Sequence, residues 1–529
     1  MSDEPGAAGE QGDLVSRLRA VIGAKDEQIA VLTAGLEASL ERERRLELRL
    51  TELERRLSMD SSDSGTPSSK ERIGAREARR ARQQPERERG KDRKRGGQPG
   101  HKGKGLARDP DPGEKKDAPP PAECRRCKSG LDGAETAGSR WAQVIDAEII
   151  KKVTEWALPG LLCPCCGTVT FAAPPPGAHA GAVSYGPVLN AAAVLLTAYG
   201  NVPPERAARL TGMLPGTEVS AGWVGKAGAR LSALPGKGGL DAAMLAALAG
   251  EKALAADETP VNVPGRNVQP AVQDEKEERD PEEKDGKTTS GAPHVLIVRT
   301  PDGRLTWLQA IASRRKGAVA AGIPAAFTGY LITDGYTGCQ HLLARLAGIQ
   351  QCAAHVIRRC RAVMKPGPGG AQSWAGDIIA ILREAHQAAE AARARGDTSL
   401  DPQVLADLRE RYDTAVTAGI IHSRLRDWHD GNHPGYAPGC RLRGYKEQVF
   451  LFTRDFTVDW TNNVSERGAK AARRHQAVSG YWHSLATLAR WCRVRSYPDS
   501  AAAHGVSALD AISGALAGKP WLPPLPAAA

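Results

Sequence analysis

The chain has 529 residues, and its 72 Lys and Arg residues against 61 Asp and Glu residues give a formal net charge of +11. This length allows two to four domains, and the positive charge favours a nucleic acid over a membrane as the partner. No apolar run approaches the roughly 20 residues of a membrane-spanning helix, and the N-terminus is polar rather than signal-like. We therefore expect a cytoplasmic protein that does not bind membranes.

Residues 13–58 show the heptad repeat of a coiled coil. Steps of three and four residues from Val15 to Leu57 pass through thirteen positions over six heptads, and ten of these positions are apolar. So regular a repeat predicts a coiled coil, and hence a homo-oligomer or a partner helix. A single amphipathic helix that packs on its own protein is the alternative.

Residues 59–115 form a basic segment without the pattern of a packed domain. Between Lys70 and Lys104 there are 14 Lys or Arg residues and 5 Asp or Glu residues, and the stretch 95–105 is rich in Gly. We expect a flexible linker that neutralises DNA phosphates without reading the base sequence. A linker that only keeps the protein soluble is the alternative.

Two CxxC motifs in residues 116–175 predict a zinc ribbon. The four sulfur atoms belong to Cys124, Cys127, Cys163 and Cys166. Four thiolates suit one tetrahedral structural zinc ion, and strand-like runs at 141–150 and 153–158 lie between the motifs. A pair of redox thiols is the alternative, although the βαβ context of thioredoxin-like chemistry is absent.

Residues 176–245 contain several predicted helices. We expect a buried helix over 186–199, then helices over 203–210 and 219–231 that are joined by a turn at Thr211 and Gly212. The last two resemble a helix-turn-helix in outline, with Ser220 as the N-cap. Because helical hairpins that only pack are commoner than DNA readers, both interpretations stay open.

A pattern of strands begins at residue 246. The strands are predicted at 254–263, 294–299, 304–309, 329–335 and 349–353, with helices at 316–327 and 339–346. The order β-β-β-α-β-α-β is that of a ribonuclease H-like core. An acidic stretch at 274–285, after the first strand, predicts a disordered loop.

The sequence therefore predicts a multidomain α/β protein. Its core is divided into a first part at 246–362, a helical insertion at 363–455, a final part with the last core helix at 456–500, and a C-terminal tail at 501–529. Because the insertion interrupts the core, only the fold can bring the two core parts together.

Three acidic residues fall where these elements would bring them together. Asp257 lies in the first core strand, Asp334 ends the fourth, and Glu466 lies in the final helix. Two divalent cations held by carboxylates stabilise the attacking and leaving oxygens of a phosphodiester reaction, and magnesium, or manganese in its place, prefers oxygen ligands. We expect Asp257 to bridge both ions, Asp334 to bind one and Glu466 the other, unless the carboxylates are structural. Glu258 faces the opposite side of its strand, which predicts a supporting role.

Cationic residues surround Glu466. Between Trp460 and Arg495 there are seven Lys or Arg residues, and Glu466 is the only acid. This pattern is typical of a metal ligand beside a phosphate channel. The expected DNA-binding residues are Arg467, Lys470, Arg473, Arg474 and His355. For His355, a hydrogen-bonded core histidine is the alternative.

Several motifs, taken together and in this order, resemble transposases of the insertion sequence 66 family. They are the N-terminal coiled coil, the Gly-rich stretch 96–103, the paired CxxC, Ala256-Asp-Glu-Thr-Pro260, Asp334-Gly-Tyr336, Ala354-His355 and Asn462-Asn-Val-Ser-Glu-Arg467. The resemblance implies that Asp257, Asp334 and Glu466 form a catalytic triad that acts with magnesium. It implies cleavage of DNA at element ends and joining of the freed 3′-hydroxyls to target DNA. It also implies small accessory proteins of the same element as partners, and a bacterial, nucleoid-associated protein.

The sequence departs from this family at two points. Thr461 stands where the family commonly has an aspartate before the Asn pair, and the acidic insert after Asp257 is long. Because neither departure removes a metal ligand, an active transposase remains the main prediction. The alternatives are an inactive or domesticated DNA-binding protein that occupies element ends, and a simple nuclease with the same core.

Overall fold

The structure is a computed structural model that describes residues 7–59, 107–147, 149–175, 177–234, 239–264, 292–365, 373–428 and 431–525. Only the backbone is described for residues 7–11 and for Val464, Glu466 and Arg467. Most of the predicted basic linker and the whole acidic stretch 274–285 therefore lie outside the described residues. No described helix is long and apolar enough to cross a membrane.

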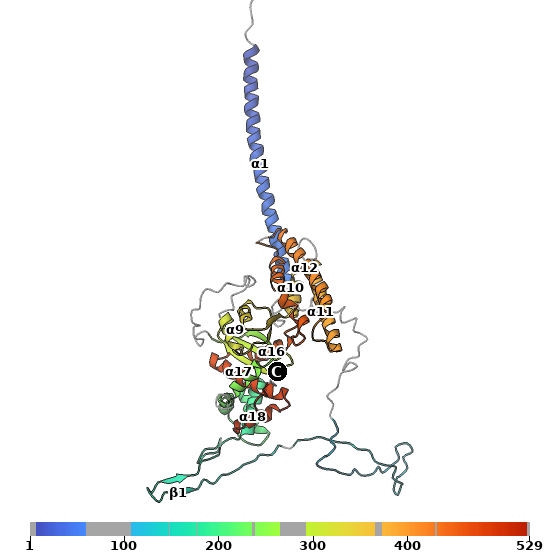
Figure 1. Cartoon of the computed structure of the whole chain (residues 1–529), viewed down its shortest axis with the longest axis vertical. Coiled ribbons are helices and arrows are strands. Elements are labelled where there is room, and N and C mark those ends of the chain that lie inside the picture. The colour runs from blue at the N-terminus through green and yellow to red at the C-terminus, as the bar shows by residue number, and fades with distance from the viewer. Residues whose placement is uncertain are drawn as a thin grey trace, which may run out of the picture.

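A long N-terminal helix, α1 (Ala7–Ser58), projects from the rest of the molecule (Figure 1). The helix predicted over 13–58 is thus confirmed. Its ten apolar heptad residues are all exposed, between 48% at Val15 and 68% at Leu46. The base of the helix is packed instead, because Glu52 is only 4% exposed and Lys365 Nζ donates to the Ser58 carbonyl oxygen at 2.7 Å. α1 is therefore anchored at its C-terminal end while its apolar face stays open.

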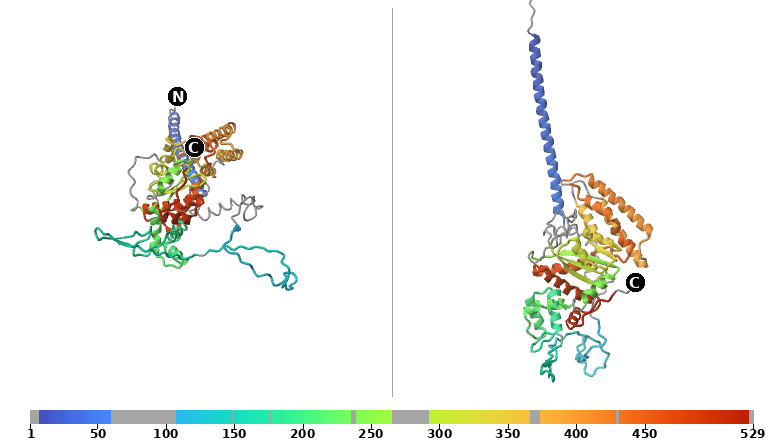
Figure 2. Two further views of the ribbon diagram at one scale, coloured as in Figure 1. Left: turned by 60° about the horizontal axis from the view of Figure 1, so that its bottom comes forward. Right: turned by 60° about the vertical axis from the view of Figure 1, so that its left-hand side comes forward.

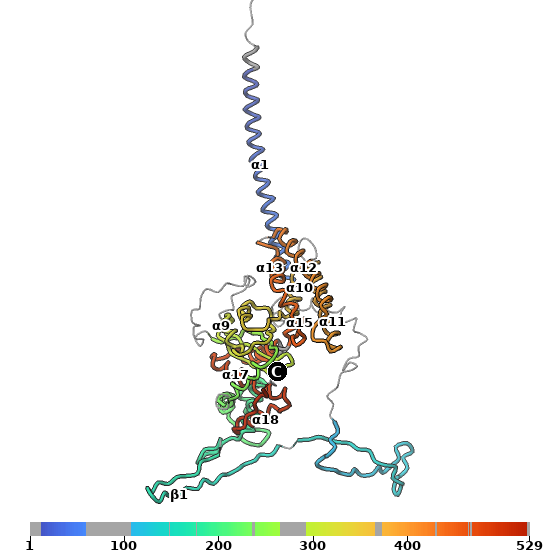
Figure 3. The backbone as a smooth tube through the Cα atoms, viewed as in Figure 1, coloured from blue at the N-terminus to red at the C-terminus, as the bar shows by residue number. Residues whose placement is uncertain are grey.

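Each CxxC motif forms a tight turn. The Cys124 N–H donates to the Ser129 carbonyl oxygen at 2.8 Å, and the Cys163 N–H donates to the Thr168 carbonyl oxygen at 2.9 Å. The second turn joins two short antiparallel strands, β1 (Gly160–Leu162) and β2 (Val169–Phe171). The chain around the two turns runs as separate extended arms, with β1 at the end of one of them (Figures 1 and 3).

The strands predicted at 141–150 and 153–158 are wrong. The described residues of both runs are extended but form no ladder. Val144 is 89% exposed and Val153 is 80% exposed. A strand needs a neighbour that accepts its backbone hydrogen bonds, and none lies beside these runs in the described part of the chain.

A helical domain follows the arms. Its elements are α3 (Pro187–Val194), the π-helix η2 (Leu195–Tyr199), α4 (Pro204–Met213), α5 (Ala221–Gly225), α6 (Ala227–Ser232) and α8 (Leu240–Ala249). The helix expected over 186–199 is present as α3 and η2, but it is buried only in part, since Val188 is 58% exposed and no residue of η2 is fully buried. Ser220 caps α5 by accepting from the Trp223 N–H at 3.2 Å. The turn expected at Thr211 and Gly212 is wrong, because α4 continues through both. A Cβ at Gly212 would lie 2.4 Å from the Thr217 carbonyl oxygen, so this glycine permits a close approach within the helix.

A five-stranded mixed sheet forms the centre of the molecule. Its strands are β3 (Ala253–Pro260), β4 (His294–Arg299), β5 (Thr306–Ile311), β6 (Tyr330–Thr333) and β7 (Gly348–Gln351). Their order across the sheet is β5-β4-β3-β6-β7. β3 pairs antiparallel with β4 and parallel with β6, so it is the middle strand. The five strands predicted for the core are confirmed, with β5 displaced by two residues.

Helices cover both faces of this sheet (Figure 2). They are α9 (Lys316–Gly322), the 3₁₀-helix η6 (Thr337–Ala344), α10 (Ala353–Val363), α16 (Asn463–Ser479) and α17 (Leu485–Ala503). α8, α9 and η6 share a core with Leu254, Leu296 and Leu331. On the other face α10 shares a core with Ala255, and α16 and α17 share one with Ile297. This alternation along each strand gives a three-layer α/β arrangement.

The predicted helical insertion is present and joined to the sheet. It consists of α11 (Ser373–Arg395), α12 (Pro402–Arg424), α13 (Tyr436–Gly444), α14 (Lys446–Val449) and α15 (Leu451–Arg454). The buried Tyr412 hydroxyl donates to the Leu442 carbonyl oxygen at 3.0 Å. Gln350 of β7 donates to the Val449 carbonyl oxygen at 3.2 Å and accepts from the Phe452 N–H at 2.9 Å. The insertion is thus tied to the sheet at its returning end.

The tail predicted at 501–529 is wrong over its first part. α17 extends to Ala503, and Ala508–Leu516 forms α18, in which Ile512 is fully buried. α17 also covers the open edge of the sheet. The Leu308 N–H donates to Ser496 Oγ at 2.8 Å, and the Thr306 N–H donates to Ser500 Oγ at 3.0 Å. These hydroxyls take the place of a sixth strand along β5.

Candidate active site

β3 delivers two neighbouring acids to one end of the sheet. The strand starts with four buried apolar residues, Ala253–Ala256, and continues with Asp257 and Glu258. Asp257 falls on the strand face of Ala255, and Glu258 on the face of Leu254 and Ala256. The two carboxylates therefore leave the strand on opposite faces.

β6 brings Asp334 to the same end. Ala255 pairs with Ile332 in the parallel ladder, so two residues further along the strands are Asp257 and Asp334. Asp334 is the first residue beyond β6, and Gly335 has a φ of +90°. This left-handed turn, which favours glycine, lets the Tyr336 N–H donate to Asp334 Oδ1 at 2.8 Å.

Arg314 connects the two strand ends, and nothing in the sequence marks it. It follows β5 in the chain and is 23% exposed. Its Nε forms an ion pair with Glu258 Oε1, and its Nη2 lies 3.2 Å from Asp334 Oδ2. One guanidinium therefore serves two largely buried carboxylates.

The charges in this cluster shift the pKa values of both acids. Burial raises the pKa of Glu258 to about 7, and repulsion from Asp334 adds to the effect against the opposing Arg314. Burial would also raise the pKa of Asp334, but Arg314, with His355 and Arg359, holds it below its usual value. Asp334 thus stays ionised at neutral pH.

Two elements beyond the strands also reach Asp334. His355, in the first turn of α10, is half-buried and close enough to stabilise the Asp334 carboxylate. A Cβ placed on Gly335 would lie 3.3 Å from Arg359 Nη1 and 3.2 Å from Arg441 Nη2. Because Arg441 belongs to α13, the helical insertion contributes to the surroundings of this site.

The beginning of α16 is fixed against β3. The side chain of Asn462, fully buried, donates through Nδ2 to the Ala256 carbonyl oxygen at 2.6 Å, and its N–H donates to Cys352 Sγ at 3.1 Å. Further along, Arg473 Nε donates to Thr259 Oγ1 at 3.1 Å. Position 466 lies four residues after Asn462 and seven before Arg473, which puts it on the helix face that meets β3. The Glu466 side chain itself lies outside the described part.

The expected DNA-binding residues of α16 whose side chains are described lie at the surface of the helix. Lys470, Arg473 and Arg474 are all exposed, and Arg473 is in addition held to β3 by its bond to Thr259. Nothing is described of the Arg467 side chain. The helix therefore presents cations to solvent beside the strand that carries Asp257.

The donor chemistry of this cluster suits a hard divalent cation. Asp257 and Asp334 supply carboxylate oxygens, which magnesium prefers. Among the described side chains, no group of three or more His, Cys, Asp or Glu residues is placed to hold a metal ion. Glu466 is not among those side chains.

The four cysteines of the predicted zinc ribbon form two separate pairs. Cys127 Sγ lies 3.4 Å from Ser129 Oγ, and Cys166 Sγ lies 3.3 Å from Thr168 Oγ1. Hydrogen bonding with Ser129 and then with Cys124 lowers the pKa of Cys127 to about 7, and Thr168 and Cys163 lower that of Cys166. Each pair is thus inclined toward the thiolate that zinc needs, but the structure does not bring the pairs together.

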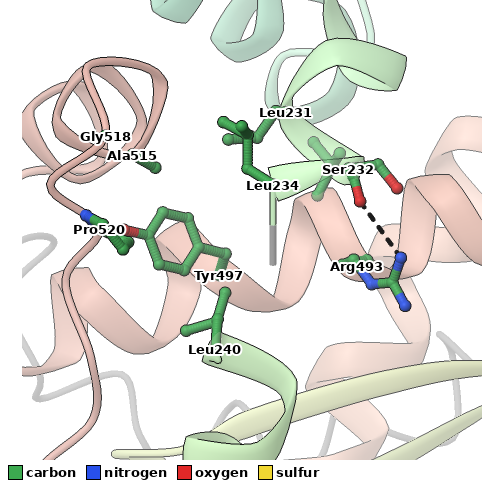
Figure 4. A pocket seen from close by; sticks show the side chains of 10 residues that line it. Leu231, Ser232, Leu234, Leu240, Arg493, Tyr497, Ala515, Gly518 and Pro520 are labelled. Carbon is green, nitrogen blue, oxygen red and sulfur yellow. Dashed lines mark hydrogen bonds between the residues drawn. The ribbon is translucent and has the colours of Figure 1, made fainter. Parts of the chain in front are cut away.

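An apolar cavity of about 210 Å³ lies away from these acids, in the helical domain (Figure 4). Leu231, Leu240 and Tyr497 line it, and Arg493 donates to the Ser232 carbonyl oxygen at 3.2 Å at its edge. None of the predicted site residues lines this cavity, so it is separate from the candidate active site.

Comparison with known proteins identifies the family. The sequence model described as "Transposase IS66 family" matches residues 182–489, which is more than half of the chain. The match includes Asp257, Asp334 and Glu466. No curated protein matches the chain.

Proposed function

The chain belongs to the IS66 family of transposases, and we propose that it cleaves the ends of its insertion element and joins the freed 3′-hydroxyls to target DNA. The single observation that carries the proposal is the ladder of β3 and β6. It ends at the Ala255–Ile332 pair, and Asp257 and Asp334 each follow two residues later, at one end of the sheet. Acids from adjacent parallel strands are suited to sharing a metal pair.

We propose a ribonuclease H-like core for this chemistry. The support is the central β3, antiparallel to β4 and parallel to β6, with helices on both faces. The anchoring of Asn462 on Ala256 supports Glu466 as the third acid, because it holds the first turn of α16 over β3.

In this proposal, Asp257, Asp334 and Glu466 would hold two magnesium ions, with Asp257 shared between both, Asp334 on one and Glu466 on the other. When bound, the ions stabilise charge on the attacking and leaving oxygens. Arg467, Lys470, Arg473 and Arg474 hold DNA phosphates beside the acids, and His355 positions a water or the scissile phosphate. Manganese can replace magnesium, because both prefer carboxylate oxygens.

The experiment uses three conservative substitutions, Asp257→Asn, Asp334→Asn and Glu466→Gln. Each is expected to abolish end cleavage and joining of a labelled element end to a plasmid, with DNA affinity unchanged. Normal joining by the Asp334→Asn variant would refute the triad. If the wild-type protein binds DNA but joins no ends, the alternative of an inactive protein that occupies element ends is favoured.

We also propose that Cys124, Cys127, Cys163 and Cys166 bind one structural zinc ion. The support is the matching turn geometry of the two motifs and the lowered pKa of Cys127 and Cys166. Elemental analysis of the purified chain should give about one zinc per chain. A content far below this, in protein prepared without chelators, would exclude the site.

For partners, we propose a homo-oligomer formed through α1. The exposed apolar heptad positions of that helix support it. Small accessory proteins of the same element, and a nucleoid-associated location in the bacterial cytoplasm, complete the proposal.

A further inference from the structure

Arg314 is held in place on several sides. Its guanidinium lies over the Tyr336 ring, 4.2 Å from the ring centre, and its own carbonyl oxygen accepts from the Tyr336 hydroxyl at 2.6 Å. Its Nε is paired with Glu258. These contacts fix the side chain before any cation or DNA is present.

Both oxygens of the Asp334 carboxylate have a donor. Oδ1 accepts from the Tyr336 N–H at 2.8 Å, and Oδ2 accepts from Arg314 Nη2 at 3.2 Å. Two donors from different directions fix the plane of the carboxylate. Since a carboxylate oxygen has two lone pairs, each oxygen keeps one for a further ligand.

The net charge of Glu258, Arg314 and Asp334 together depends on how Arg314 is shared between the two acids. Above about pH 7, where both acids are ionised, the two negative charges of Glu258 and Asp334 face the one positive charge of Arg314, so these three side chains carry a net charge of −1. Without Glu258, Arg314 would neutralise Asp334 fully. Without Arg314, Asp334 would keep its charge but lose a donor.

We propose that Arg314 and Glu258 are positioning residues of the active site: Arg314 orients the Asp334 carboxylate, and Glu258 keeps Arg314 from neutralising it. The inference rests on the proposed function, in which Asp334 binds a divalent cation. It assigns to Glu258 a role different from that of its neighbour Asp257.

The test compares Mn²⁺ affinity and single-turnover end cleavage in the full-length chain. Mn²⁺ affinity is measured from the electron paramagnetic resonance signal of free Mn²⁺, counting only the binding that Asp334→Asn removes. Arg314→Gln should tighten Mn²⁺ binding by about threefold or more, because a neighbouring positive charge is gone. Glu258→Gln should weaken it by a similar factor. Both should slow cleavage at saturating Mn²⁺, Arg314→Gln by about 100-fold.

A double variant guards against misfolding of the single ones. Glu258→Gln with Arg314→Gln removes one charge of each sign, so Mn²⁺ affinity should return close to that of wild type while cleavage stays slow. Arg304→Ala is the matched control, since Arg304 also bridges two carboxylates, Asp302 and Glu251, but at the opposite end of the sheet. It should leave both measurements unchanged.

Opposite changes in Mn²⁺ affinity for the two single variants are the signature of the proposal. Changes of the same sign, or wild-type cleavage in Arg314→Gln, would overturn it and leave the proposed function standing. If Asp334→Asn changes neither Mn²⁺ binding nor cleavage, the proposed function itself fails.

Discussion

Glu258 and Asp334 show how one residue's surroundings decide its charge. Burial and the nearby Asp334 raise the pKa of Glu258 from its ordinary 4.5 to about 7. Between these two values the folded chain holds a proton that the unfolded chain has released. The contribution of Glu258 to stability is therefore largest below about pH 4.5 and is lost as the pH rises toward 7.

We predict that Glu258→Gln removes this dependence on pH. Between pH 5 and pH 7.5 the wild-type chain should lose on the order of 1–2 kcal/mol more free energy of unfolding than the variant does. Chemical denaturation followed by tryptophan fluorescence at the two pH values measures the difference. Equal losses of the free energy of unfolding in both proteins would show that burial does not raise the pKa of Glu258.

At this scale the sequence predicts the acids better than their partners. Asp257 and Asp334 follow apolar runs, so their positions at strand ends could be anticipated. Arg314 and Arg441 could not, because each is an isolated arginine whose importance depends on folding. Only the folding together of β5, β6 and the insertion brings Arg314 to Asp334 and Arg441 to the neighbouring Gly335.

Among the elements, α16 packs very closely against the central sheet. Gly468 faces β4, and a Cβ there would lie 2.9 Å from Ile297 Cγ2. Ile297 pairs with Asp257 across the β3–β4 ladder. The absence of a side chain at residue 468 thus sets how closely the helix that carries Glu466 approaches the strand that carries Asp257.

We predict that Gly468→Ala lifts α16 from the sheet, lowers stability by about 1–3 kcal/mol and slows end cleavage. Thermal unfolding and a cleavage assay report the two effects. Gly444→Ala is the control, because a Cβ at that helical glycine meets nothing within 4 Å. Equal stability and cleavage in both variants would mean that α16 does not depend on this close contact.

Whether a predicted element forms depends on the neighbours that it packs against, and this explains which elements could be predicted. The strands of the sheet alternate or run as apolar segments between clear turns, and all five are confirmed. The runs at 141–150 and 153–158 have similar composition but no neighbouring strand, so they stay unpaired. Gly212 looks like a turn in the sequence, yet it lies inside α4, where the lack of a side chain lets the Thr217 carbonyl oxygen approach closely.

Across the whole molecule, α1 and the helical insertion are connected. Arg44 of α1 forms an ion pair with Asp427, and burial, with Arg426 and Arg55 nearby, lowers the pKa of His433 to about 4. The last turns of α1 thus pack near the insertion that brings Arg441 close to Gly335 in the candidate active site. Pairing of α1 helices would therefore set the distance between two active sites.

We predict that Leu32→Glu dissociates the oligomer, because Leu32 is an apolar heptad residue. Val31→Glu is the matched control, since the two residues are 65% and 72% exposed but Val31 lies outside the heptad positions. Light scattering after size-exclusion chromatography measures the mass. Dissociation by both variants, or by neither, would argue against a coiled-coil seam.

The central claim is that the carboxylates at the ends of β3 and β6 bind the divalent cations of the reaction. It is tested most directly by replacing Asp334 with a softer ligand, Asp334→Cys, and measuring end joining with Mg²⁺ and with Mn²⁺. A thiolate binds Mg²⁺ poorly and Mn²⁺ better. The account predicts no joining with Mg²⁺ and partial recovery with Mn²⁺, whereas joining at the wild-type rate with Mg²⁺ would contradict it.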